Sequence, residues 1–234
     1  MNNAIPHLSV VIPVFNESGN VQPLVEEVEQ ALIGRLCFEI VVVDDASNDG
    51  TAVELATLQS VRHSLRVETH PLNRGQSAAI RTGVKSCRAP VVAMLDGDGQ
   101  NDPADIPALF AVLDTSCDVR MVVGERRHRK DSRVRRLSSR LANKARSLLL
   151  DDGIKDTGCG LKVFYRDEFL ELPTFDHMHR FLPALFQQRG GRVRSLPVNH
   201  RPRRHGSSKY GVSNRFWAGI VDLLGVRWLG KRRL

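Results

Sequence analysis

The chain has 234 residues, of which 41% are hydrophobic and 26% charged, and its formal net charge is +8. This length suits one large domain, or one domain with an extension, and allows a substantial buried core. Four widely spaced cysteines without a Cys-x-x-Cys pair argue against a zinc site or a disulfide framework and favour reduced thiols in a cytosolic protein. We expect no signal peptide, because the N-terminus lacks a basic region followed by a long apolar segment. We also expect no membrane span, because no uncharged apolar run approaches the necessary ~20 residues.

Charge is divided unevenly along the chain. Residues 1–119 hold 7 Lys and Arg against 16 Asp and Glu, whereas residues 120–234 hold 27 against 10. The first part therefore has a formal charge of −9 and the second part +17. Such asymmetry predicts an anionic partner for the second part, which would be a nucleic acid, a membrane surface or a phosphorylated substrate.

Short apolar runs alternate with helical stretches through the acidic part of the chain. The predicted strands are 8–13, 38–43, 65–69 and 91–95. The predicted helices are 20–36, with Asn20 as the N-cap, 51–61, and 76–86. This alternation predicts an α/β fold with a Rossmann-like, mainly parallel sheet flanked by helices on both faces.

The fourth predicted strand ends in the segment 96–100, Asp-Gly-Asp-Gly-Gln. Side chains alternate along an extended chain, so Asp96 and Asp98 point the same way, and the glycines let a ligand approach the backbone. Two carboxylates this close repel each other unless a cation or a proton lies between them, and such oxygen ligands suit Mg2+ or Mn2+. The alternative is a solvated turn or a structural Ca2+. The spacing is not that of an EF-hand, because no Glu occupies the twelfth position counted from Asp96.

Polar loops follow three of the four predicted strands, at Asn16-Glu17, Asp44-Asp45 and 96–98. Parallel strands share one carboxyl edge, where α/β sheets bind ligands, so we expect the three loops side by side. Their carboxylates can accept hydrogen bonds from a base or a ribose while a metal neutralises a diphosphate. The absence of Gly-x-x-x-x-Gly-Lys-Ser/Thr and of Gly-x-Gly-x-x-Gly argues against a P-loop NTPase and a dinucleotide dehydrogenase.

Four motifs together resemble a known family. They are VVIPVFNE at 10–17, VVVDDASNDGT at 41–51, NRG at 73–75 and LDGDGQ at 95–100. They closely resemble the GT-A-fold inverting glycosyltransferases of family 2, and more narrowly the dolichyl-phosphate mannose synthases and their bacterial polyprenyl-phosphate relatives. The resemblance covers about residues 8–229. It implies a donor site formed by Pro13, Phe15, Glu17, Asp44, Asp45 and Asp96. It also implies Mg2+ or Mn2+ held by Asp96, Asp98 and Gln100, with Asp98 among the catalytic residues.

A strand predicted at 118–124 is followed by a basic stretch, since residues 120–150 contain 11 Lys and Arg and two acids. Within it, 133–150 has the spacing of an amphipathic helix. Such a helix is commonly a solvated face packed on its own core. Nucleic-acid binding is a second interpretation, but aromatic residues for stacking on bases are missing here. In the resembled family this region accepts the lipid phosphate, and Arg126, Arg135 and Ser139 match the acceptor-phosphate positions.

Two later segments also match the resembled family. The segment 156–162, DTGCGLK, resembles Asp-x-x-x-Gly-Phe-Arg near the acceptor site and implies a catalytic role for Asp156, although an Asp before glycines is usually a turn residue. The segment 203–209 resembles Arg-x-x-Gly-x-Ser-Lys, which closes over the donor diphosphate and metal, and implies catalytic roles for Arg203 and Lys209. A Gly/Ser loop that carries Arg and Lys can surround phosphate oxygens with N–H groups and positive charge.

The remaining predicted elements are a helix that Met178 opens and that continues to about Arg189, and a strand at 193–198. His177 and His179 have no convincing set of metal partners, and we expect them at surface or packing positions.

The last predicted helix spans 212–229 and divides the chain into a catalytic domain, 1–211, and a C-terminal segment, 212–234. It is too short, and too interrupted by charged residues, to span a bilayer. Its tryptophans and its basic end, 231–233, suit a helix that lies at a membrane interface. The alternative is that its apolar stripe packs on the domain or in a homodimer.

The expected function is metal-dependent, inverting transfer of a hexose from a GDP- or UDP-sugar to a polyprenyl phosphate, either dolichyl or undecaprenyl. A phosphate acceptor is already ionised near neutral pH, so no strong general base is needed. The same fold and donor with a polysaccharide or other hydroxyl acceptor is one alternative. A non-catalytic protein that binds membranes or nucleic acid is another. On the expected function the chain has no nucleic-acid partner and lies in the cytoplasm, peripherally on the inner face of the cell membrane.

Overall fold

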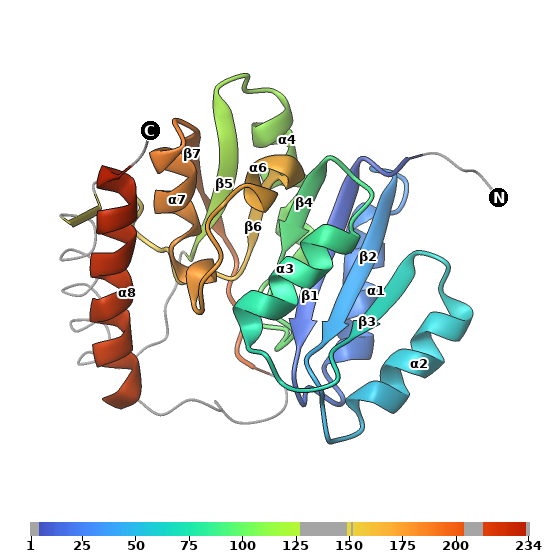
Figure 1. Ribbon diagram of the computed structural model, residues 1–234. Coiled ribbons are helices and arrows are strands. Elements are labelled where there is room, and N and C mark those ends of the chain that lie inside the picture. The colour runs from blue at the N-terminus through green and yellow to red at the C-terminus, as the bar shows by residue number, and fades with distance from the viewer. Residues whose placement is uncertain (1–4, 127–148, 151, 204–212, 233–234) are drawn as a thin grey trace.

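The structure, a computed structural model, describes residues 5–126, 149–150, 152–203 and 213–232. One sheet runs through the molecule, and helices cover both of its faces (Figure 1). The strands are β1 (Leu8–Val14), β2 (Phe38–Asp44), β3 (Leu65–Thr69), β4 (Val91–Met94), β5 (Val119–Arg126), β6 (Lys162–Tyr165) and β7 (Arg192–Val198). The helices are α1 (Val21–Leu32), α2 (Thr51–Val61), α3 (Gln76–Ser86), α4 (Ile106–Asp114), α6 (Arg166–Leu170), α7 (Leu182–Gln188) and α8 (Ser213–Lys231). Two 3-10 turns, η1 (Pro103–Asp105) and η2 (Met178–Arg180), precede α4 and α7.

The seven strands follow the order β3-β2-β1-β4-β6-β5-β7. The neighbours from β3 to β4 are parallel, β6 is antiparallel to both β4 and β5, and β7 is parallel to β5. The prediction of a mainly parallel sheet flanked by helices is therefore confirmed. Because β1, β2 and β4 run in the same direction, their carboxyl ends meet at one edge.

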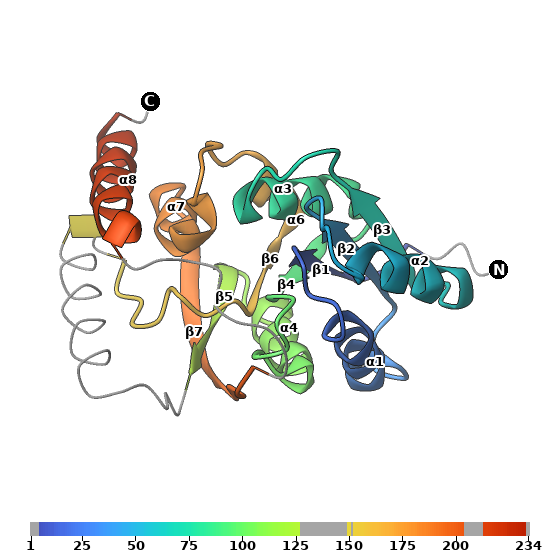
Figure 2. The same cartoon turned by 90° about the horizontal axis from the view of Figure 1, so that it is seen from below.

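Two hydrophobic cores lie on opposite faces of the sheet. Side chains of β1 alternate between them, since Leu8, Val10 and Ile12 belong to one core and Val11 to the other. Helices α1, α2 and α4 contribute to the first core, and α3, α6 and α7 to the second. Figure 2 shows α1 and α4 on one side of the sheet and α3, α6 and α7 on the other.

Most predicted elements lie where the sequence places them. α2 and β3 have the predicted bounds, and α3 ends at the predicted residue. The prediction for α1 was partly wrong, because the helix ends at Leu32 and Asn20 makes no side-chain capping hydrogen bond. The side-chain amide of Asn20 instead donates from Nδ2 to Glu17 Oε2 at 2.7 Å. The helix predicted from Met178 is interrupted, with η2 followed by α7, and most of the helix predicted at 133–150 lies outside the described residues.

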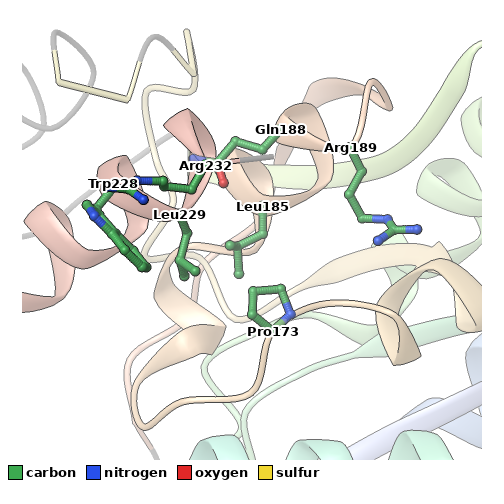
Figure 3. A pocket seen from close by; sticks show the side chains of 7 residues that line it. All are labelled: Pro173, Leu185, Gln188, Arg189, Trp228, Leu229 and Arg232. Atoms are coloured by element: carbon green, nitrogen blue, oxygen red, sulfur yellow. The ribbon is translucent and has the colours of Figure 1, made fainter. Parts of the chain in front are cut away.

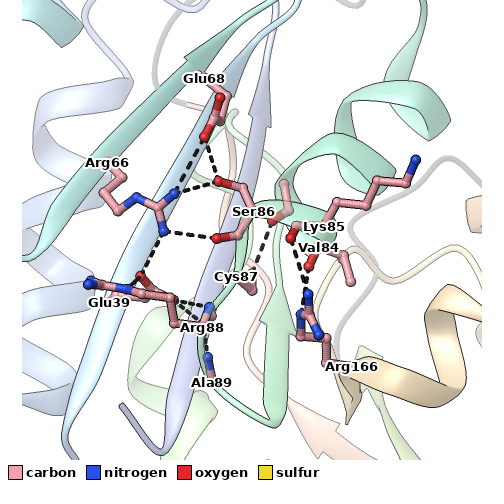
Figure 4. Close-up of polar contacts among 12 residues, drawn as sticks. Glu39, Arg66, Glu68, Val84, Lys85, Ser86, Cys87, Arg88, Ala89 and Arg166 are labelled. Carbon is pink, nitrogen blue, oxygen red and sulfur yellow. Dashed lines mark hydrogen bonds and ion pairs between the residues drawn. The ribbon is translucent and has the colours of Figure 1, made fainter. Parts of the chain in front are cut away.

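A buried polar cluster ties the strands together at their amino edge (Figure 4). Glu39 of β2, which is 2% exposed, accepts hydrogen bonds from Ser9 Oγ at 2.6 Å and from the backbone N–H of Arg88 at 2.6 Å. Arg66 of β3 donates to Glu39 at 3.2 Å and to the carbonyl of Ser86, at the end of α3, at 2.8 Å. Burial raises the pKa of Glu39, but the hydrogen bonds from Ser9 and Arg88 outweigh it and hold the pKa below its ordinary value. This edge is opposite the one where the polar loops meet.

α8 packs against the domain through one face and exposes another. Val226 is buried in the second core, and its carbonyl accepts a hydrogen bond from Gln188 of α7 at 3.0 Å. On another face Val221, Leu224 and Trp228 are 67%, 55% and 57% exposed. Within the described ranges, no helix is both long enough and apolar enough to cross a membrane.

Candidate active site

The loops after β1, β2 and β4 converge at the carboxyl edge of the sheet. Val14 and Asp44 are paired at the ends of β1 and β2, and the backbone N–H of Asp45 donates to the carbonyl of Val14 at 2.9 Å. The loops are also joined through Asn16, whose N–H donates to Ser47 Oγ at 2.8 Å. Asn16 adopts a left-handed backbone with φ of 54°, a conformation that asparagine tolerates better than most residues. The polar loops are therefore neighbours, as the parallel strands predict.

Arg203 contacts two of the other predicted site residues, Asp98 and Glu17. Arg203 Nη2 donates to Asp98 Oδ2 at 2.9 Å and lies 3.7 Å from Glu17 Oε1. Burial lowers the pKa of Arg203, but the hydrogen bond and charge of Asp98 outweigh it and raise the pKa above its ordinary value. The guanidinium is therefore a cation held between two carboxylates at the carboxyl edge of the sheet.

Asp96, like Asp98, is partly buried, and its neighbours are polar. Gln76, the first residue of α3, donates from Nε2 to Asp96 Oδ1 at 2.8 Å, and the N–H of Asp96 donates to Asn101 Oδ1 at 3.3 Å. A Cβ at Gly160 would overlap Asp96 Oδ2 and lie 2.6 Å from Asn101 Oδ1, so only glycine fits there. Burial, and next the charge of Asp98, raise the pKa of Asp96. A proton or a cation beside this carboxylate would offset both effects.

The donor set fits a hard divalent cation. Asp96 and Asp98 supply carboxylate oxygens, and Gln100 lies beside them, with its N–H donating to Asp98 Oδ1 at 3.1 Å. The described residues contain no group of three or more His, Cys, Asp or Glu side chains that could enclose a metal. Two carboxylates on an open edge match the way Mg2+ is held in phosphate-transfer sites, where water and substrate phosphates complete the coordination.

The carboxylates of the β2 loop are engaged by the protein itself. Asp44 Oδ1 accepts from the N–H of Ser47 at 3.0 Å. Asp45 accepts from His70 Nδ1 at 2.6 Å and from the N–H groups of Arg74 and Gly75 at 2.9 and 2.8 Å. Asp45 therefore shapes the loop that leads into α3 and presents Gln76 to Asp96. Contact of Asp44 and Asp45 with a donor stays a prediction.

Pro13 and Phe15 flank the end of β1, next to the metal-site segment. Pro13 is paired with Val43 inside the sheet, and Phe15 is half-buried just after the strand. A Cβ at Gly97 would lie 3.0 Å from the Pro13 carbonyl oxygen and 2.7 Å from Val14 Cγ1. The segment that carries Asp96 therefore packs directly on the end of β1.

Arg126, at the end of β5, is held by Asp156. Its Nε and Nη2 donate to the two oxygens of Asp156, each at 2.7 Å, and its N–H donates at 3.2 Å. Burial lowers the pKa of Arg126, but the hydrogen bond and charge of Asp156 outweigh it and raise the pKa above its ordinary value. Three further predicted residues, Arg135, Ser139 and Lys209, lie outside the described residues.

Four residues near the carboxyl edge of the sheet were not predicted as site residues, namely Gln76, Asn101, Gly160 and Lys162. Lys162 is 2% exposed, donates to the carbonyl of Cys159, and has its pKa lowered by burial. The sequence feature that could have pointed to Gln76 is the glycine before it, because Gly75 has a φ of 85° and turns the chain into α3. Gly160 matters because it has no side chain to collide with Asp96, and no local sequence pattern marks this requirement.

A family model described as glycosyl transferase family 2 matches residues 9–172. The chain is 36% identical over 224 residues to the dodecaprenyl-phosphate galacturonate synthase of Rhizobium johnstonii, covering 94% of this chain and 66% of that protein. It is 37% identical over 206 residues to the undecaprenyl-phosphate 4-deoxy-4-formamido-L-arabinose transferase of Pseudomonas fluorescens, covering 87% and 60%. The chain thus spans less than two thirds of the length of these relatives.

Solved structures share the fold at lower sequence identity. Glucosyl-3-phosphoglycerate synthase from Mycobacterium tuberculosis, in complex with Mn2+, UDP-glucose and glycerol 3-phosphate, superposes with a TM-score of 0.72 at 17% identity. The match covers 96% of this chain and 80% of that one. The same enzyme with Mg2+ and UDP gives a TM-score of 0.74 over 94% and 80% of the two chains, also at 17% identity. The similarity extends over nearly the whole described sheet.

Proposed function

The chain belongs to glycosyl transferase family 2, and from this premise we propose that it transfers a hexose from a nucleotide diphosphate sugar to a polyprenyl phosphate, with inversion at the anomeric carbon. The observation that carries the proposal is the meeting of Asp98, Glu17 and Arg203 at the carboxyl edge of the sheet. The names of the two relatives, both of which specify a polyprenyl phosphate, support this class of acceptor.

The donor lies across the loops after β1, β2 and β4. Its nucleoside contacts Pro13, Phe15, Glu17 and the Asp44-Asp45 loop, and its diphosphate lies over Asp96 and Asp98. A UDP-sugar and a GDP-sugar both fit this arrangement. The solved neighbour that contains UDP-glucose supports the uridine donor as the first one to test.

A divalent cation, Mg2+ or Mn2+, held by Asp96, Asp98 and Gln100 would neutralise the departing nucleoside diphosphate when bound. Arg203 is held by Asp98 in the structure, so its positive charge lies at the same carboxylate. On donor binding it exchanges a carboxylate oxygen for a phosphate oxygen, and Lys209, from the same resembled motif, adds a second positive charge. Positive charge aimed at the leaving diphosphate stabilises the charge that develops as the sugar is transferred.

The acceptor phosphate binds at Arg126, with Arg135 and Ser139 from the following basic stretch. Asp156 fixes the Arg126 guanidinium in two hydrogen bonds, so its role in the reaction is to position that arginine. A carboxylate paired in this way is a poor proton acceptor, and an ionised phosphate nucleophile needs none. A hydroxyl acceptor does need a base, so the Asp156–Arg126 pair favours the phosphate acceptor over the polysaccharide alternative.

The enzyme works in the cytoplasm, peripherally on the inner face of the cell membrane. The exposed stripe of α8 (Val221, Leu224 and Trp228) supplies apolar contact, and the basic residues at the end of the helix supply attraction to anionic lipids. The division into a catalytic domain, 1–211, and a membrane-contacting segment, 212–234, follows from this placement.

A panel of sugar nucleotides assayed against undecaprenyl phosphate, with and without Mn2+, tests the proposal. We expect one sugar nucleotide to yield a lipid-linked sugar in a metal-dependent reaction. Equilibrium binding of the same sugar nucleotides separates the outcomes. Donor binding without lipid-linked product would favour a hydroxyl acceptor, and no donor binding would favour a non-catalytic protein.

A further inference from the structure

A groove of about 440 Å³ lies between α7 and α8, far from the loops of the candidate active site. This volume falls within the ~300–1,000 Å³ typical of small-molecule sites. Its apolar lining comes from Pro173, Leu185, Leu229 and Trp228, and its charged lining from Arg189 and Arg232. In Figure 3, Leu185, Leu229 and Pro173 lie between Trp228 on one side and Arg189 on the other.

The charge around the groove is positive. The guanidinium carbon of Arg232 lies 5.5 Å from the centre of the Trp228 ring, and Arg189 is paired with Glu171. The helix segment 227–232 carries three basic residues and no acid. An apolar floor beside a cation stacked on an indole is complementary to a molecule with a hydrocarbon chain and an anionic group.

The groove is separate from the predicted acceptor site. Arg189 lies just before β7, at the amino end of that strand, whereas the other end of β7 pairs Val198 with Arg126. The strand has seven residues, which span roughly 20 Å at about 3.3 Å per residue. A phosphate held by Arg126 therefore cannot be the one that the groove receives.

We propose that this groove binds one anionic phospholipid of the membrane surface. The phosphate lies beside Arg232, with Arg189 at the far margin, and an acyl chain lies against Pro173, Leu185 and Leu229. The exposed stripe of α8, which ends at Trp228 next to the groove, lies on the same helix and faces the same lipids. The site involves no step of the proposed transfer reaction.

Short-chain phosphatidylglycerol, kept below its micelle-forming concentration, is a suitable probe because it binds as a single molecule. The chain has two tryptophans, so Trp217→Phe leaves Trp228 as the sole indole reporter in the groove. We expect a saturable change in Trp228 emission with phosphatidylglycerol, and at least about tenfold weaker binding of phosphatidylcholine of the same chain length. Inorganic phosphate alone should neither change the emission nor displace the lipid.

Two matched pairs of variants localise the binding, each made in the Trp217→Phe chain and checked by its melting temperature. Arg232→Ala should weaken phosphatidylglycerol binding about tenfold or more, whereas Arg227→Ala, five residues earlier in the chain and outside the lining, should change it less than twofold. Leu229→Ser should weaken binding, whereas Leu224→Ser should not. Equal effects within either pair, equal binding of both lipids, phosphate binding on its own or no saturable binding would each overturn the proposal. The experiment contains neither donor nor acceptor, so its failure leaves the proposed transferase function untouched.

Discussion

Asp98 and Arg203 lie 105 positions apart in the sequence and are joined by a hydrogen bond of 2.9 Å. A carboxylate and a guanidinium in contact neutralise each other until a ligand with its own charges separates them. On the proposed function the ligand is a metal with a diphosphate, and the metal would take the carboxylate while the phosphates would take the guanidinium. Until a ligand binds, the carboxylate of Asp98 and the guanidinium of Arg203 therefore neutralise each other's charge.

Replacing Asp98 by Ala should remove a metal ligand from a loop without disturbing the core. We expect transfer to fall by about 4 kcal/mol of transition-state stabilisation, or roughly 1,000-fold, with an unchanged melting temperature. The measurement is the rate of lipid-linked sugar formation at saturating donor and Mn2+. Asp114→Ala, an exposed acid at the end of α4, is the matched control. Near-normal turnover of Asp98→Ala would show that the metal is held elsewhere.

The two hydrogen bonds between Asp156 and Arg126 lead to a second prediction at this scale. Asp156→Asn removes the charge that holds the guanidinium while keeping the side chain's shape. We expect the KM for the lipid phosphate to rise about ten- to hundredfold, as for loss of a charge-assisted hydrogen bond, with donor affinity unchanged.

A double-mutant cycle with Arg126→Ala distinguishes positioning from proton transfer. If Asp156 acts through Arg126, the double variant should be no worse than Arg126→Ala alone. A general base would behave differently, because its loss would lower kcat at saturating acceptor and leave the KM for the lipid phosphate nearly unchanged.

At the scale of elements, Glu39 joins β2 to β1, β3 and the end of α3 (Figure 4). Its folded-state pKa is lowered, so its ionised form is favoured in the folded protein. This contribution to stability is complete above the unfolded pKa of about 4.3 and is lost as the pH falls through the lower folded pKa. Glu39→Gln should cost about 1–3 kcal/mol at pH 7 and less at pH 3.

Urea unfolding at pH 7, 5 and 3 measures this difference. The wild-type chain should lose more stability than Glu39→Gln as the pH falls below 5. Glu68→Gln is the matched control, since Glu68 lies at the more exposed margin of the same cluster and is 38% exposed as a side chain. A constant difference in the free energy of unfolding between wild type and Glu39→Gln across the pH range would mean that Glu39 has the same pKa in the folded and unfolded chains.

Elements with clear periodicity or clear end signals were predicted, including the short strands β3 and β4, whereas β6, α4 and α6 were not. β2, Phe38–Asp44, is a nearly continuous buried apolar run bounded by polar residues, and the sequence alone locates it. β6, Lys162–Tyr165, has four residues and begins with a buried lysine, a residue type that the sequence alone would place at the surface. α4, Ile106–Asp114, is an apolar run too short for helical periodicity to distinguish it from a strand.

The same distinction holds for the candidate site. Asp96, Asp98 and Glu17 follow strands and were predicted to lie together because parallel strands share an edge. Gln76 and Gly160 reach Asp96 only through the packing of α3 and of the segment before β6 on the sheet. Local sequence marks the turn at Gly75, but it carries no information about which residue Gln76 or Gly160 then meets.

At the scale of the whole molecule, the distribution of charge matches the distribution of proposed roles. The part with a net charge of −9 carries the metal carboxylates, and the part with +17 carries the residues that meet the lipid phosphate and the membrane. We therefore expect the full chain to sediment with anionic vesicles and much less with neutral ones. Each basic residue near an anionic surface contributes about 1 kcal/mol, and salt screens this contribution.

Salt should weaken vesicle binding only partly, because the exposed stripe of Val221, Leu224 and Trp228 adds apolar contact that salt does not screen. Truncation after Ser213 removes the stripe and the basic end of α8 together and should abolish most of the sedimentation. If the full chain stays in the supernatant with anionic vesicles at low salt, then the exposed face of α8 is covered by protein instead.

The segment 156–162 touches both sides of the site, since Asp156 holds Arg126 and Gly160 packs against Asp96. On the proposed function, a shift of this segment toward one substrate would also change the residues that hold the other. Thermodynamic linkage then applies: whatever factor the lipid phosphate contributes to the affinity for metal and donor, the donor returns to the lipid phosphate. On the proposed function we therefore expect the two substrates to be coupled through the backbone of this segment, so that a sugar nucleotide bound without its acceptor would be held differently from one bound with it.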